Sequence, residues 1–156
     1  MRRRTILAFM LDRPGVLNKV SMLIRRKMYN VDTLAVCSSR VAGISRMTIT
    51  LQEEKDALVT QIIKQLEKIT EVISVKELNA ENSYWREAAI VKLEIDHKIL
   101  QSFQKQLHFE LLDQKSEDLH IIQIAGSTKQ IDNFLDEIGR ECIVEIARTG
   151  VSALEK

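Results

Sequence analysis

One order of strands and helices occurs twice in this chain of 156 residues, and it limits the fold more than any other feature. Residues 5–11 form an apolar run of strand length, and from residue 16 the apolar side chains follow the spacing of one helix face. The pattern then predicts strands over 31–38 and 44–51 around a turn at 41–43, a helix over 53–68 and a strand over 72–78. The first 78 residues thus predict the order βαββαβ.

The second half repeats this order after a polar break at residues 79–83. It predicts strands over 87–95, 109–114, 119–125 and 143–147 and helices over 98–107 and 131–138. This order is the ferredoxin-like arrangement, so we expect an α+β fold of two ferredoxin-like βαββαβ units. The predicted boundaries are a first domain over 1–78, a linker over 79–86 and a second domain over 87–156. No clear residue-level repeat relates the two halves.

Both faces of the first predicted strand are apolar. Its residues alternate between two apolar sets, Ile6, Ala8 and Met10 on one side and Leu7, Phe9 and Leu11 on the other. A sheet covered by helices on one side only alternates apolar with polar residues, so something else must cover the second face. The second domain or a partner subunit would serve, and we expect a homodimer.

Composition and charge exclude several classes of protein. The formal net charge of +1 argues against binding nucleic acid through bulk electrostatics. No apolar run is long enough for a membrane span, and the first residues do not match a signal peptide. Cys37 and Cys142 lie in apolar strand-like runs far apart in the chain, so we expect two buried free thiols in a reducing cytoplasm.

Residues with catalytic or metal-binding patterns are missing from the sequence. His97, His108 and His120 show no metal-ligand spacing with each other or with the cysteines. The sequence has no glycine-rich phosphate loop and no nucleophile elbow, and its carboxylates fall on the polar faces of the predicted helices. We therefore expect no catalytic residues, no metal and no cofactor on this chain.

The junction between the first strand and the first helix is a candidate anion site. Pro14 fits the first helical position, and Gly15 has no side chain to keep a ligand from the backbone. The N–H groups of Gly15, Val16 and Leu17 then lack partners within the helix, and together with the helix dipole they would stabilise an anion by roughly 0.3–2 kcal/mol. An ordinary Pro-Gly turn is the alternative interpretation.

Several motifs resemble one known family. They are Asp12-Arg13-Pro14-Gly15-Val16-Leu17, Arg26-Lys27-Met28-Tyr29-Asn30-Val31, Ser45-Arg46-Met47-Thr48-Ile49 and Glu145-Ile146-Ala147-Arg148-Thr149-Gly150-Val151. The first three resemble the ACT domain of acetolactate synthase (acetohydroxyacid synthase) small subunits, and the last resembles that family's carboxy-terminal motif. The resemblance covers nearly the whole chain and implies that the first unit is an ACT domain.

This resemblance implies a cytoplasmic, non-catalytic regulatory subunit. It would bind and activate a catalytic large subunit, on which thiamine diphosphate, Mg²⁺ and FAD are expected, and would confer feedback inhibition by valine or another branched-chain amino acid. The family's effector residues carry over onto Asp12, Gly15, Val16 and Leu17 of one chain and onto Asn30 and Val31 of its partner.

The chain departs from the family pattern at two positions, and two other functions compete with this one. The family usually has Asn at the position of Asp12 and Gly at that of Met28. One competing function is a free-standing ACT-type amino-acid sensor that regulates another enzyme. The other is a small hydrolase of the acylphosphatase kind, for which Arg13 and Asn30 would have to hold phosphate and water.

Overall fold

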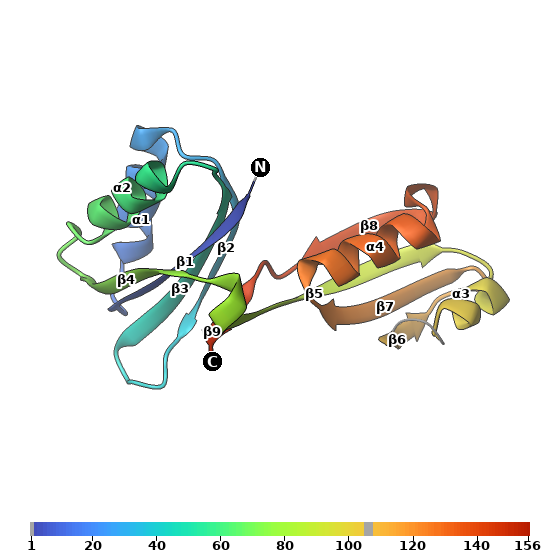
Figure 1. Cartoon of the computed structure of the whole chain (residues 1–156). Helices are drawn as coiled ribbons and strands as arrows, with labels where there is room; N and C mark the ends of the chain where they lie inside the picture. Colours follow the sequence, from blue (N-terminus) through green and yellow to red (C-terminus); the bar gives the residue numbers. More distant parts are fainter. Residues whose placement is uncertain (1, 105–107) are drawn as a thin grey trace. The chain divides into compact units, whose positions relative to one another are not determined.

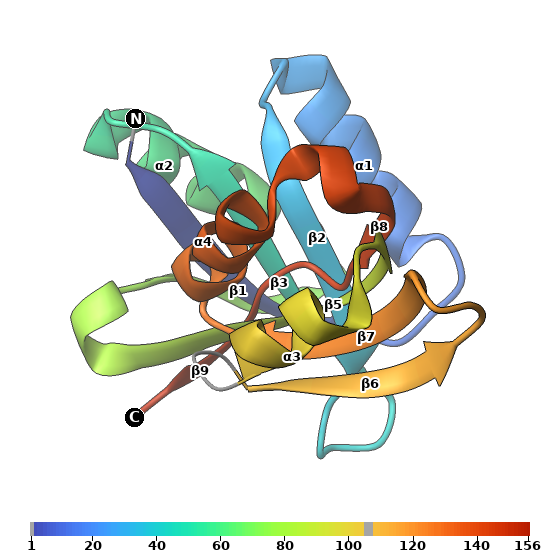
Figure 2. The same ribbon diagram turned by 90° about the vertical axis from the view of Figure 1, so that its right-hand side faces the viewer.

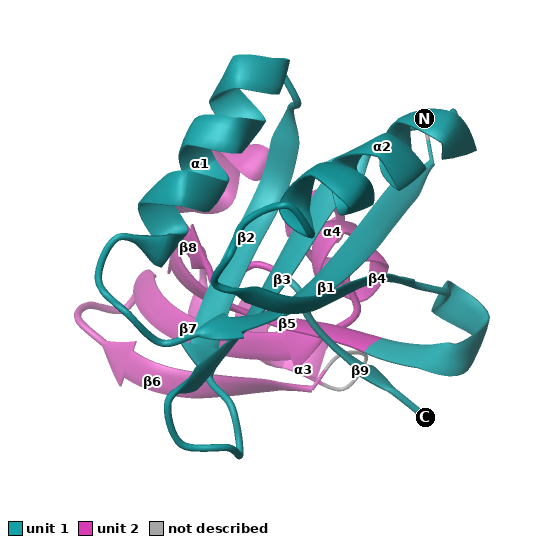
Figure 3. Cartoon of the chain, turned by 90° about the vertical axis from the view of Figure 1, so that its left-hand side faces the viewer, with its two compact units in different colours: residues 1–84, 151–156 teal, residues 85–150 magenta. Residues whose placement is uncertain are grey.

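The chain forms two compact units, one made of residues 1–84 and 151–156 and the other of residues 85–150 (Figure 3). The structure is a computed structural model and describes residues 2–104 and 108–156. Each unit packs helices against an antiparallel sheet, so the predicted α+β fold of two βαββαβ units is confirmed. In the described chain, no helix is long and apolar enough to cross a membrane.

The first unit has two helices on one face of a four-stranded sheet (Figure 1). The sheet order is β2-β3-β1-β4, and all neighbouring strands are antiparallel. The elements in chain order are β1 (Arg3–Leu11), α1 (Val16–Lys27), β2 (Val31–Ser38), β3 (Ile44–Gln52), α2 (Asp56–Leu66) and β4 (Val72–Leu78). These bounds differ from the predicted ones by three residues at most.

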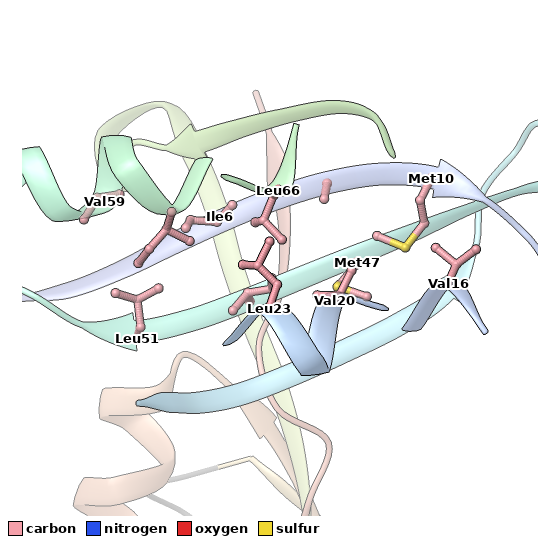
Figure 4. Close-up of a cluster of buried hydrophobic side chains, with 12 residues drawn as sticks. Ile6, Met10, Val16, Val20, Leu23, Met47, Leu51, Val59 and Leu66 are labelled. Carbon is pink, nitrogen blue, oxygen red and sulfur yellow. The ribbon is translucent and has the colours of Figure 1, made fainter. Parts of the chain in front are cut away.

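The core of this unit lies between the helices and the sheet (Figure 4). One side of β1 and the facing side of β3 contribute Ile6, Ala8, Met10, Met47, Ile49 and Leu51, and the helices contribute Val16, Val20, Leu23, Val59, Ile62 and Leu66. The helical residues recur at the 3–4 residue spacing that places them on one face. Complete burial of each large side chain stabilises the fold by about 1.5–3 kcal/mol.

Helix α1 ends in a left-handed residue that is not glycine. Met28 has φ 56° and ψ 31°, and its N–H donates to the carbonyl of Arg25 at 3.1 Å. The N–H of Tyr29 reaches back to the carbonyl of Ile24 at 3.2 Å, so the two bonds close the last turn. The helix therefore ends in the left-handed conformation that glycine favours, although Met28 has a side chain. That side chain is 88% exposed.

We expect Met28→Gly to stabilise the first unit by about 1 kcal/mol, because glycine removes the strain of the left-handed conformation. Urea denaturation measures the change. Met22→Gly is the matched control, since Met22 is also exposed but lies inside α1. There glycine should destabilise by about 1 kcal/mol. Destabilisation by both substitutions would contradict the interpretation.

The chain's own last residues cover the second face of β1. Thr33, Arg46 and Lys76 all lie on this face, by their register with Thr5, Phe9 and Leu7 respectively. Arg46 donates to the carbonyl of Ala153, Lys76 pairs with Glu155, and the N–H of Val151 donates to Thr33 Oγ1 at 3.4 Å. We call residues 151–156 the C-terminal strap; it contains β9 (Ser152–Glu155), which the sequence did not predict. The two apolar faces of β1 therefore do not require a second copy.

The second unit builds a similar layered structure (Figures 1 and 2). Its elements are β5 (Ser83–Glu94), α3 (His97–Gln104), β6 (Phe109–Gln114), β7 (Leu119–Gly126), α4 (Thr128–Ile138), η2 (Arg140–Cys142) and β8 (Ile143–Arg148). The strand order is β6-β7-β5-β8, and β9 also pairs with β5. The segment 79–86, the predicted linker, contains η1 (Ala80–Asn82) and the first residues of β5. Residues 105–107 of the predicted third helix lie outside the described residues.

Side chains from both helices and three strands form the second core. Its buried members are Ala89, Val91, Leu93, Ile95, Leu100, Phe109, Ile122, Ile124, Ile131, Phe134, Leu135 and Ile138. Phe134 of α4 is fully buried, and its ring lies 6.5 Å from that of Phe103 and 5.7 Å from that of Phe109. At the start of α4, Ser127 and Gln130 form a reciprocal capping box.

A buried arginine ties three elements of the first unit together. Arg4 is 5% exposed, and its Nε and Nη1 lie 2.5 Å from Glu77 and 2.6 Å from Asp56. The hydrogen bond to Glu77 is the main reason why the pKa of Arg4 is raised. Arg4 lies two residues before Ile6, which faces Glu77 across the sheet.

The second unit has a similar buried ion pair, in which the buried residue is the carboxylate and its partner is the arginine. Buried Glu87 lies two residues before Ala89, which faces Arg148 across the sheet. Arg148 Nε donates to Glu87 at 2.5 Å, and Nη1 pairs with Asp132 of α4 at 2.7 Å. Desolvation lowers the pKa of Arg148, but hydrogen bonds to Asp132 and Glu87 raise it overall. This common position is a residue-level correspondence between the units that the sequence analysis missed.

The prediction of two buried thiols is wrong for Cys37. Its thiol is free but exposed, because the second half of β2 runs along the outer edge of the sheet. Cys142 is free and half-buried in η2. Within the described residues, no three His, Cys, Asp or Glu side chains are grouped so that they could hold a metal ion.

Candidate functional site

Three backbone hydrogen bonds fix the segment that follows β1. The N–H of Leu11 donates to the carbonyl of Glu71 at 2.8 Å, and that of Asp12 donates to the carbonyl of Gly43 at 2.8 Å. The N–H of Arg13 turns back to the carbonyl of Leu11 at 3.0 Å. The β2–β3 turn and the connection between α2 and β4 thus hold this segment in place before α1 begins.

A tight turn then leads into α1. Gly15 has φ 85° and ψ −9°, and the N–H of Val16 donates to the carbonyl of Arg13 at 3.3 Å. With Pro14 before this left-handed glycine, residues 13–16 form a type II β-turn. The prediction that Pro14 is the first helical residue is therefore wrong, because Gly15 is the N-cap and α1 begins at Val16. The Val16 N–H was expected to be free, but it forms the hydrogen bond that closes this turn.

Several backbone donors remain open at this helix end. No side chain caps α1, and the N–H groups of Gly15 and Leu17 donate to no acceptor among the described residues. A Cβ added to Gly15 would meet no atom within 4 Å, so the space beside the turn is open. Exposed amides at the positive end of a helix favour a carboxylate or another anion.

The charged side chains around the turn carry both signs. Lys19 Nζ lies 2.5 Å from Glu71 Oε1, and this hydrogen bond is the main reason why the pKa of Glu71 is lowered. The positive charge of Arg13 acts on Glu71 in the same direction. Asp12 is exposed beside the turn. A zwitterion with a carboxylate and an ammonium group suits such a surface better than a polyanion does.

The remaining predicted residues are divided between the two ends of α1. The Val16 side chain is in the core, whereas Leu17 is 45% exposed beside the turn. Asn30 is exposed and Val31 is half-buried, but both follow the far end of α1. The 12 residues of this helix span about 18 Å. One chain therefore does not bring Asn30 to its own turn, and Arg13 and Asn30 cannot form the site of a small hydrolase.

The outer edge of β2 is a surface that the sequence analysis did not single out. Within the described sheet, β2 pairs only with β3, so its other edge is open. Leu34 and Val36 face the same side as Ile49 and Met47 but stay 38% and 42% exposed. Their alternation with Thr33 and Ala35 in the sequence is the signal that could have identified them. An open strand edge with apolar side chains is suited to pairing with another chain.

Two family descriptions match successive parts of the chain. Residues 6–74 match the ACT domain of the kind found in the small subunit of acetohydroxyacid synthase (AHAS). Residues 86–156 match the family described as the small subunit of acetolactate synthase. The two matches follow one another along the chain and overlap none of their residues.

Individual relatives match along nearly the whole chain. The probable acetolactate synthase small subunits of Methanothermobacter thermautotrophicus and Archaeoglobus fulgidus are each 32% identical, over 97% of this chain and over 91% and 96% of their own lengths. The acetolactate synthase small subunit of Bacillus subtilis is 29% identical over 99% of this chain and 91% of its own. The crystal structure of the Thermotoga maritima small subunit superposes with a TM-score of 0.91 at 28% identity, covering 100% of this chain and 98% of that one.

Proposed function

Because this chain belongs to the family of acetolactate synthase small subunits, we propose that it regulates an acetolactate synthase without catalysis of its own. It binds the catalytic large subunit, raises its activity and makes it sensitive to valine or another branched-chain amino acid. Thiamine diphosphate, Mg²⁺ and FAD belong to the catalytic partner in this proposal. Support comes from the whole-length similarity and from the uncapped backbone amides of the turn before α1, which are suited to an anion.

The effector site in this proposal lies between two copies of the chain. A two-fold arrangement that runs the two α1 helices antiparallel brings the turn at Gly15 of one copy to Asn30 and Val31 of the other. The open edge of β2, with Leu34 and Val36, supplies a self-complementary surface for such a dimer. The separation of the predicted residues along α1 supports this arrangement, because a single copy cannot close the site.

Each part of an amino acid has a partner at this site. The open amides of Gly15 and Leu17 hold the carboxylate, and the Asp12 carboxylate holds the ammonium group. The half-exposed Leu17 side chain and Val31 of the second copy surround the aliphatic side chain. Burial of that side chain contributes about 1.5–3 kcal/mol. The uncapped amides are the observation on which the site depends most.

Calorimetric titration of the purified chain tests the site directly. We expect saturable heat with L-valine or another branched-chain amino acid and no saturable heat with valinamide, which keeps the side chain and ammonium group but lacks the carboxylate. Equal binding of valine and valinamide would show that the amides do not hold a carboxylate. The absence of binding by valine, leucine and isoleucine would contradict the proposed effector site.

A further inference from the structure

The C-terminal strap is bonded to three of the four strands in the first unit's sheet. Its residues contact Thr33 on β2, Arg46 on β3 and Lys76 on β4. Val151 and Ala153 are 1% and 2% exposed, so these two residues of the strap are buried. The strap follows directly on Gly150, the last residue of the second unit, so a shift of the strap acts on the chain at that boundary.

The Thr33 hydroxyl forms two hydrogen bonds. The Val151 N–H can only donate, so Thr33 Oγ1 accepts from it at 3.4 Å. The Thr33 proton is then available for Thr50 Oγ1, which lies 2.5 Å away on β3. Thr50 is fully buried, and this second bond ties Thr33 to β3, whereas only the first bond reaches the strap. A shift of Thr33 thus acts directly on the first residue of the strap.

The strand is irregular between the proposed effector residues and Thr33. Val31 pairs with Leu51 and Thr33 pairs with Thr50, so two steps on β2 correspond to one step on β3 and Asp32 has no opposite residue. Such a bulge leaves the extra residue unpaired, interrupts the ladder and bends the strand at this point. Asn30 and Val31 lie immediately before the bulge and Thr33 immediately after it.

We propose that Thr33 is the positioning residue through which an amino acid bound at Asn30 and Val31 acts on the C-terminal strap. This inference rests on the proposed function and adds the route of its regulation. The ligand orders the strand before the bulge, Thr33 follows, and the Val151 bond tightens the strap. Coupling between distant sites commonly amounts to about 5- to 150-fold, and one net hydrogen bond supplies about 2- to 12-fold of it.

Hydrogen exchange of the strap amides, measured with and without L-valine, tests the route. In the parent chain we expect valine to slow exchange in the peptide over residues 150–156 by about fivefold or more. In Thr33→Val, which keeps the shape but removes the hydroxyl, the valine effect on the strap should disappear while calorimetry still shows valine binding. Thr33→Ser restores the hydroxyl and should restore the effect.

Thr50→Val is the matched control for the loss of the Thr33–Thr50 bond. It removes that bond but leaves the lone pair of Thr33 facing the Val151 N–H, so the valine effect on the strap should persist. Thr33→Ala serves as a second variant without the hydroxyl if Thr33→Val folds poorly.

Distinct outcomes overturn the inference and the proposed function. If the parent binds valine but its strap exchange does not change, the inference is wrong and the effector site stands. The inference is also wrong if Thr33→Val keeps the parent's valine effect, or if it abolishes valine binding itself, which would place Thr33 in the binding site. If the parent binds none of the three branched-chain amino acids, the proposed function fails first.

Discussion

Gly15→Asp is expected to abolish inhibition by valine while leaving activation of the catalytic subunit largely intact. The new carboxylate would occupy the open space beside the turn, cap the free amides and repel the ligand carboxylate. Regulation requires a ligand with different affinities for two states, and such couplings are typically about 1–3 kcal/mol. The free energy lost with the carboxylate contacts is large enough to remove this coupling. Acetolactate formation by the mixed subunits, measured over a valine titration, gives both quantities.

Gly15→Asn is the matched control, because Asn has nearly the same shape as Asp but no charge. Asn and Asp both tolerate the left-handed conformation of Gly15 better than other side chains, and a Cβ there meets no neighbouring atom. We expect Gly15→Asn to retain weakened inhibition, because it caps the amides without repelling a carboxylate. If Gly15→Asp responds to valine like the parent, the effector binds elsewhere. If both variants also lose activation, the substitutions disturb the docking of the subunit rather than the effector site.

Phe134→Ala is expected to cost about 3–5 kcal/mol and to unfold the second unit preferentially. Phe134 is fully buried on α4, and it contacts the rings of both Phe103 and Phe109, so its loss leaves a cavity that neither ring can fill alone. Hydrogen exchange should rise in β7 and α4 but stay unchanged in β1 and β3. Ile99→Ala, at a half-exposed position of α3, is the matched control and should change stability by about 0.5 kcal/mol or less. Equal acceleration in both units would contradict the assignment of separate cores.

The sequence predicted those elements whose pattern is local. Helix α1 shows its apolar stripe within a few turns, and β2, β4 and β6 show their alternation or apolar runs within single short segments. The family motifs also lie within short segments, so the sequence alone shows the resemblance. The Pro14-Gly15 turn was located correctly, but its type was not, because the sequence alone does not tell a helical first turn from a type II turn.

Features that depend on distant contacts could not be predicted in this way. β9 has only four residues, and the strap that contains it is held by Thr33, Arg46 and Lys76, which are distant in sequence. Glu87 looks like a surface carboxylate until Arg148 and Thr128 are placed around it. The exposure of Cys37 follows from the position of β2 at the edge of its sheet, which the apolar run around this cysteine does not reveal.

Acetolactate formation by the purified catalytic subunit, with and without this chain, tests the central claim most directly. We predict no product from this chain alone, a higher rate when the two are mixed, and a fall of that rate as valine or another branched-chain amino acid is added. A catalytic subunit whose rate is the same with and without the chain, at every effector concentration, would contradict it. That result would leave a free-standing amino-acid sensor as the alternative for a chain that still binds valine.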